Sequence, residues 1–184
     1  MEKNLHQEFN ENSFSQKNHD AIIESLEKKY GTIGFRVSET PLFLTEETTK
    51  QIVSASIDII NQLSTDEYRA ISAHTIPADF TPHGKALHSQ EHWCIDFALT
   101  EDQNGKLKPM LIEAQAGSSL LAFSGEIAEE FKNKINLGEA YSYTLSAQDH
   151  SSYIESLKKE IVGKHDPKTV VLLDVEPEKQ KLMM

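Results

Sequence analysis

Three oxygen-bearing side chains lie in two segments that the sequence predicts as neighbouring β-strands. Asp96 belongs to residues 92–99 (HWCIDFAL), and Glu113 and Gln115 belong to residues 107–115 (LKPMLIEAQ). Because alternate residues of a strand point to the same face, Glu113 and Gln115 should share one face. Two carboxylates and an amide oxygen are hard ligands, of the kind that Mg²⁺ takes together with substrate phosphates. We therefore interpret Asp96, Glu113 and Gln115 as a candidate magnesium site.

The segment between these strands predicts that they form an antiparallel hairpin. Residues 101–106 (EDQNGK) contain Asn-Gly, the strongest short hairpin signal. A hairpin centred near Gln103 and Asn104 would place Asp96 opposite residue 112, one position short of Glu113. A β-bulge or a longer loop would close that offset. The sequence thus predicts the hairpin and leaves open whether the two acids face each other.

The remaining elements would have to hold this hairpin in place. Apolar residues at helical spacing predict helices before and after it, and Gly31 and Thr45 supply a stop and a start. Residues 74–90 are expected to form a loop, and the Tyr141/Tyr143 alternation is strand-like. The expected helices cover about 20–30, 46–63, 65–71, 120–132 and 151–161. The fold class is α/β (α+β), with an antiparallel hairpin packed against helices.

The hairpin sequence resembles the metal-binding hairpin of ATP-grasp enzymes, over CIDFAL…DQNGKLKPMLIEAQAGSSL. That family carries an Asp on one strand and Glu-x-Asn on the next, and these residues hold Mg-ATP. The resemblance implies that Asp96 is the first metal ligand and Glu113 the second. Gln115 stands where the family usually has Asn, which lengthens the third ligand by one methylene. The cofactors implied are Mg²⁺ and ATP.

The order of parts is similar to that of circularly permuted ATP-grasp proteins of the glutathionylspermidine-synthase-like kind. The hairpin precedes KTVVLLDVEPEKQ (168–180), which looks like the opening strand and helix of a further α/β domain. We expect a flexible N-terminal arm over 1–17, an ATP-grasp-like lobe over 18–165 and the truncated start of a second domain over 166–184. The resemblance also assigns three small residues to the loop that faces the cofactor and acceptor: Gly117, Ser118 and Ser119.

The function implied by the resemblance is ATP- and Mg²⁺-dependent ligation of a carboxylate with an amine or thiol. In the family a second lobe supplies lysines for the phosphates, and this chain contains neither G-x-G-x-x-G nor G-x-x-x-x-G-K-[ST]. The chain alone is therefore expected to be inactive. Its expected partners are a small-molecule substrate and a missing lobe, in a longer chain or in a partner chain. A lobe without its partner would expose apolar surface, so a homodimer is a further hypothesis.

A histidine motif gives an alternative function. His88, Glu91 and His92 match H-x-x-E-H, in which two histidines on a helix hold Zn²⁺ and the glutamate acts as general base. Pro82 and Gly84 precede the motif and a predicted strand follows it, which disfavours the helix that this zinc hydrolase would need. A non-catalytic binding or assembly domain is the other alternative.

Composition excludes several classes of protein. The 184 residues carry 18 Lys and Arg against 29 Asp and Glu, a formal charge of −11 that argues against nucleic-acid and anionic-membrane partners. The single cysteine, Cys94, cannot form an internal disulfide. No run of 18 apolar residues predicts a membrane span, and residues 1–16 lack a signal-peptide core. We expect a cytoplasmic location.

Overall fold

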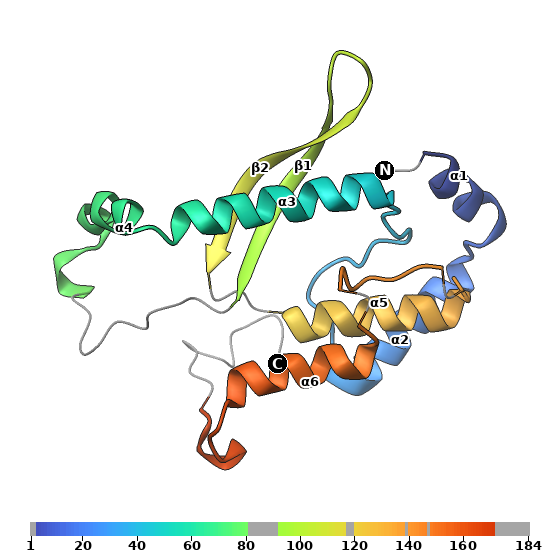
Figure 1. Cartoon of the computed structure of the whole chain (residues 1–184). Coiled ribbons are helices and arrows are strands. Elements are labelled where there is room, and N and C mark those ends of the chain that lie inside the picture. The colour runs from blue at the N-terminus through green and yellow to red at the C-terminus, as the bar shows by residue number, and fades with distance from the viewer. Residues whose placement is uncertain (1–2, 81–91, 117–119, 139, 147, 172–184) are drawn as a thin grey trace. The chain divides into compact units, whose positions relative to one another are not determined.

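The computed structural model describes residues 3–80, 92–116, 120–138, 140–146 and 148–171 (Figure 1). The described residues contain six α-helices and a two-stranded antiparallel sheet, which confirms the mixed α and β class. They form two units. One comprises residues 44–116, and the other comprises residues 3–43 together with residues 120–171.

The first unit is an amphipathic helix beside a hairpin. Helix α3 (Glu46–Leu63) packs against strand β2 (Leu107–Ala116), which pairs with strand β1 (Trp93–Glu101), as Figure 1 shows. Helix α3 begins where the sequence predicts, because the Thr45 hydroxyl accepts a hydrogen bond from the Thr48 backbone N–H at 3.0 Å. Helix α4 (Asp66–Ser72) and two 3₁₀ helices, Ala73–Thr75 and Ala78–Phe80, follow α3.

The turn of the hairpin is built as its sequence predicts. Gly105 takes a φ of 74°, a left-handed conformation that glycine adopts without steric cost. The Asp102 carboxylate accepts hydrogen bonds from the backbone N–H groups of Asn104 (2.8 Å) and Lys106 (2.9 Å). These backbone hydrogen bonds, with Lys106 contributing most, lower the pKa of Asp102. The turn therefore closes through local contacts alone, and its residues suffice to specify it.

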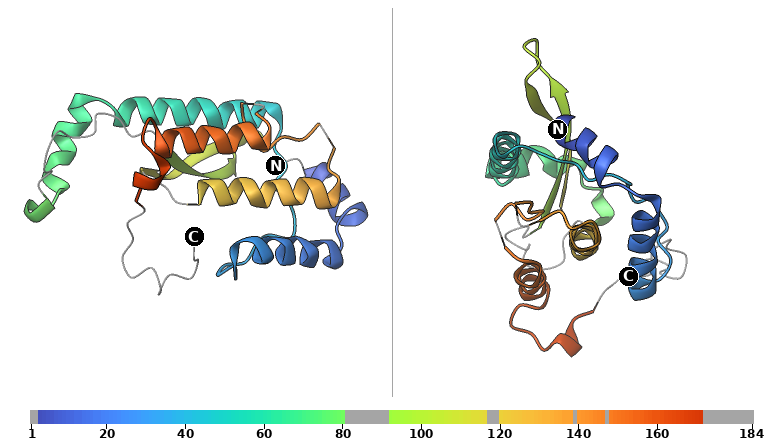
Figure 2. Two further views of the ribbon diagram at one scale, coloured as in Figure 1. Left: turned by 90° about the horizontal axis from the view of Figure 1, so that it is seen from below. Right: turned by 90° about the vertical axis from the view of Figure 1, so that its right-hand side faces the viewer.

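The second unit holds the apolar core. Helices α1 (Lys3–Asn12) and α2 (Gln16–Tyr30) precede the first unit in sequence, and α5 (Leu121–Ile135), α6 (His150–Val162) and a 3₁₀ turn (Pro167–Thr169) follow it. In Figure 2, α5 lies between α2 and α6, and it packs against both. The core is made of Ile22, Leu26, Val37 and Phe131. Ile22 and Leu26 are fully buried, as their helical spacing in the sequence suggests.

The N-terminal residues 1–17, expected to be a flexible arm that is ordered only where Phe9 or Phe14 docks, include a helix. Residues 3–12 form α1, because Phe9 docks against Phe43 with ring centroids 5.7 Å apart and is buried. Helix α2 begins at Ser15, whose hydroxyl accepts from the backbone N–H of Asn18 at 3.1 Å. The sequence predicts this helix from about residue 20, for which Asn18 or Asp20 is a possible cap. Serine is as good a cap as either, so the residue types alone do not choose among the three positions.

Two strand predictions are not met within the described residues. Tyr141 and Tyr143 lie in an irregular segment between α5 and α6. Val170 and Val171 belong to no strand and are 36% and 80% exposed. Leu172 onward lies outside the described residues, so the second domain over 166–184 stays a prediction. Within the part of the chain that the structure describes, no helix has the length and apolar character to cross a bilayer.

Candidate functional site

The register of the hairpin brings the two predicted acids face to face. Asp96 pairs directly with Glu113, whereas the next residue, Phe97, pairs with Leu111. Ile112 is therefore the extra residue of a β-bulge on β2. Residues paired across two antiparallel strands point to the same face, so the bulge supplies the one-residue shift that a symmetric hairpin lacks.

One face of the hairpin gathers the polar groups. Cys94 pairs with Gln115, two positions from the Asp96–Glu113 pair, so all four side chains share that face. Asp96, Glu113 and Gln115 are exposed, whereas Ile95 and Phe97, on the opposite face, are half-buried. The bulge thus places the candidate ligands on one face and leaves Ile95 and Phe97 on the other.

Cys94 contacts one of the carboxylates of this face. Its thiol is 3.5 Å from Oδ1 of Asp96, to which it donates a hydrogen bond. Burial raises the pKa of Cys94, and the neighbouring charges of Asp96 and Glu113 raise it further. The thiol is therefore held protonated near neutral pH and does not add a soft thiolate to the site.

This donor set fits a magnesium ion shared with a ligand better than a metal held by protein alone. Among the described residues, no three His, Cys, Asp or Glu side chains converge as a closed metal site requires. Asp96 and Glu113 supply two carboxylates on a rigid strand pair, with the Gln115 amide on the same face. Mg²⁺ characteristically takes one or two carboxylates and completes its shell with water and phosphate oxygens. The residues present match that requirement.

Other predicted site residues fall outside the described part of the chain. These are Gly117, Ser118 and Ser119 of the small-residue loop, and His88 and Glu91 of the histidine motif. His92 is described, and it directly precedes β1 without belonging to a helix. His92, the described residue of H-x-x-E-H, therefore does not lie in a helix, which the zinc motif would require.

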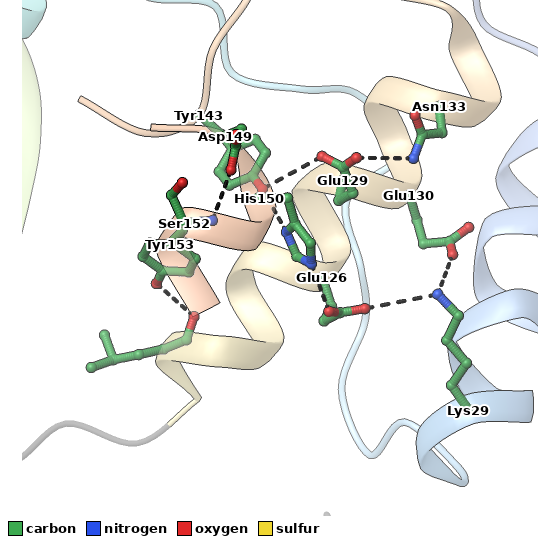
Figure 3. Close-up of polar contacts among 11 residues, drawn as sticks. Lys29, Glu126, Glu129, Glu130, Asn133, Tyr143, Asp149, His150, Ser152 and Tyr153 are labelled. Atoms are coloured by element: carbon green, nitrogen blue, oxygen red, sulfur yellow. Dashed lines mark hydrogen bonds and ion pairs between the residues drawn. The ribbon is translucent and has the colours of Figure 1, made fainter. Parts of the chain in front are cut away.

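A second polar cluster escaped the sequence analysis (Figure 3). His150, the first residue of α6, uses both ring nitrogens: Nε2 lies 2.8 Å from Oε1 of Glu126 on α5, and Nδ1 lies 2.7 Å from the Tyr143 hydroxyl. Tyr143 also donates a 3.5 Å hydrogen bond to Glu129. On the other side of α5, Lys29 bonds to Glu130 at 2.8 Å. No sequence motif links these residues, because packing of three helices brings them together.

The cluster perturbs the ionisation of its members. Burial disfavours the charged form of Glu126, but hydrogen bonds from Tyr30 and His150 outweigh it and lower the pKa of this carboxyl. Burial raises the pKa of Tyr143 to about 12, and the charge and hydrogen bond of Glu129 act in the same direction. Glu126 therefore stays ionised and Tyr143 stays neutral over the physiological range.

Comparisons of this chain with protein-family models, with curated proteins and with solved structures found no match.

Proposed function

We propose that the β1–β2 hairpin is a magnesium-nucleotide element of the ATP-grasp type, serving ATP-dependent ligation of a carboxylate with an amine or thiol. The observation that carries the proposal is the bulge after Asp96, which pairs this residue with Glu113. A bulge costs ladder hydrogen bonding and is typically placed where a side chain must be re-aimed.

Three residues of the face have a role in this proposal. Asp96 and Glu113 would hold the metal, and the Gln115 amide oxygen would be a weaker third ligand. Bound there, Mg²⁺ would supply charge neutralisation to the phosphates during phosphoryl transfer. The rigid strand pair keeps the two carboxylates oriented without a loop rearrangement. A partner lobe, in a longer chain or in another chain, would contribute the cationic groups for the phosphates.

The proposal is tested with Mn²⁺ as a paramagnetic substitute for Mg²⁺. Free Mn²⁺ is measured by electron paramagnetic resonance in titrations of the full chain, with and without ATP. We expect the wild-type chain to bind Mn²⁺ and to bind it more tightly with ATP. Asp96→Asn should weaken binding at least about tenfold, because it removes a charged ligand. Glu101→Gln, a carboxylate change at the far end of the same strand, serves as the matched control and should leave binding unchanged.

Two outcomes would contradict the proposal. One is a wild-type chain that takes up no Mn²⁺ in either condition. The other is equal weakening by Asp96→Asn and Glu101→Gln, which would reveal only a general effect of net charge. Either result would favour a non-catalytic binding or assembly domain.

A further inference from the structure

A crevice opens between α5, α6 and the segment that joins them. Its volume is about 470 Å³, within the range of roughly 300–1,000 Å³ that small-molecule sites occupy. Gly125 and Ala128 of α5 form one wall, and Tyr153 of α6 and Tyr143 of the joining segment form others. The rest of the lining is formed by Leu145 and by four polar residues, Ser124, Thr144, Ser146 and Gln148. Small residues and aromatic rings thus give the crevice much of its apolar surface.

Close packing fixes one of the rings. A Cβ built on Gly125 would lie 2.6 Å from Cε1 of Tyr153, so the absence of a side chain there lets the ring rest on α5. The Tyr153 hydroxyl donates a 2.8 Å hydrogen bond to the backbone oxygen of Leu121 (Figure 3). The ring of Tyr143 stands at 89° to that of Tyr153, with centroids 6.4 Å apart. Two perpendicular tyrosine rings therefore form adjoining walls.

The joining segment is held in place by its own polar groups. The Thr144 hydroxyl donates to the backbone oxygen of Gln148 at 2.6 Å, and the Ser142 hydroxyl donates to the backbone oxygen of Thr144 at 2.9 Å. The contact of the Tyr143 hydroxyl with His150 ties the same segment to α6. These bonds order the Tyr143 wall before any ligand arrives, which reduces the entropy lost on binding.

The charge around the crevice is negative. None of the described residues that line it is charged, but Tyr143 contacts Glu129 directly and Glu126 through His150. Lys29, the cation of this network, is already bonded to Glu130 at 2.8 Å and lies 3.8 Å from Glu126. Figure 3 shows the acids on the α5 side of the Tyr143 ring. Such a field repels anionic ligands and attracts cations.

We propose that the crevice of Gly125, Ala128, Tyr143, Leu145 and Tyr153 binds a small organic ammonium ion. The tyrosine faces attract such a cation through their quadrupoles, and the apolar wall accommodates its alkyl groups. The carboxylates behind Tyr143 add longer-range attraction. This site lies in the helical unit, and it does not depend on the hairpin proposal.

The test compares choline with 3,3-dimethylbutan-1-ol, its neutral counterpart of nearly the same shape. Each is titrated into the ¹⁵N-labelled full chain, and amide chemical shifts are followed by NMR. We expect choline to shift the amides of Gly125, Ala128 and Tyr143 in a saturable manner. The neutral alcohol should bind at least about threefold more weakly, because it lacks the cation–π attraction. Equal affinities would overturn the proposal, as would saturable choline shifts confined to other residues or no shifts at all.

Two variants sharpen the assignment. Tyr153→Leu removes one aromatic wall and should weaken choline binding about threefold or more, whereas Tyr68→Leu, in the other unit, should not change it. If Tyr153→Leu fails to fold, the comparison of choline with its neutral counterpart on the wild-type chain still decides. Choline affinity unaltered in a folded Tyr153→Leu protein would refute the role of the aromatic walls.

Discussion

Gly125 offers a substitution whose sign depends on tertiary packing. In an isolated helix, Gly→Ala stabilises, because alanine loses less backbone entropy on folding. In α5, however, the new Cβ would lie 2.6 Å from Cε1 and 3.0 Å from Cδ1 of Tyr153. These are ring atoms rather than the free end of a flexible side chain, and the ring is anchored by its hydroxyl to Leu121. We therefore expect Gly125→Ala to destabilise the protein.

The opposing free energies can be compared. Helix propensity favours alanine by about 1 kcal/mol. Forcing the ring away costs about 1–3 kcal/mol for overpacking. Weakening the hydrogen bond from Tyr153 to Leu121 adds about 1 kcal/mol. The net expectation is a loss of about 1–3 kcal/mol in the free energy of unfolding.

A double-mutant cycle separates these contributions. Urea unfolding followed by circular dichroism is measured for the wild type, Gly125→Ala, Tyr153→Ala and the double variant. With the ring removed, Gly125→Ala should become stabilising by about 1 kcal/mol, because only helix propensity remains. A stabilising Gly125→Ala in the wild-type background would refute the reasoning. The same is true of a loss that persists unchanged when Tyr153 is alanine.

Three further predictions concern single groups. His19→Leu should stabilise the protein by about 1 kcal/mol in urea unfolding. Both ring nitrogens are shielded from solvent and lack a hydrogen bond among the described residues. A lower free energy of unfolding in the variant would show that the imidazole is paired. Phenolate absorbance should show Tyr143 titrating at about 12, and Glu129→Gln should lower that pKa. An unfolded tyrosine loses its proton near pH 10, whereas folded Tyr143 keeps it up to about pH 12. The free energy of unfolding should therefore fall between pH 10 and about pH 12, by about 1 kcal/mol after solvent screening. A free energy of unfolding that does not change over this pH range would contradict this. Thr45→Ala should cost about 1 kcal/mol by removing the cap of α3, and Thr45→Ser should restore most of it.

Interactions between residues close together in the sequence explain most of the helices and the turn that were predicted correctly. The apolar spacing of Ile22 and Leu26 marks the buried side of α2, Thr45 marks the start of α3, and Asp102 with Gly105 builds the hairpin turn. Each depends on residues within a few positions of one another, so the necessary information is present in short stretches of sequence.

The geometry of the candidate site depends on the register between the two strands. The sequence identified Asp96 and Glu113 as candidate ligands, but counting from the turn left them one residue out of register. The bulge at Ile112 corrects this. It leaves Ile95 and Phe97 on the half-buried face opposite the two acids, and burial of that face is a property of the assembled unit.

Other features depend on contacts between segments that are far apart in the sequence. Phe9 orders α1 by docking on Phe43, and His150 joins Tyr143 to Glu126, a residue 24 positions earlier in the chain. Helical periodicity and capping act over one or two turns, so the sequence predicted most of the helices, the hairpin turn and a set of candidate metal ligands. The pairing register and the crevice beside Tyr143 depend on contacts between distant segments, whose free energy exists only once those segments are packed together.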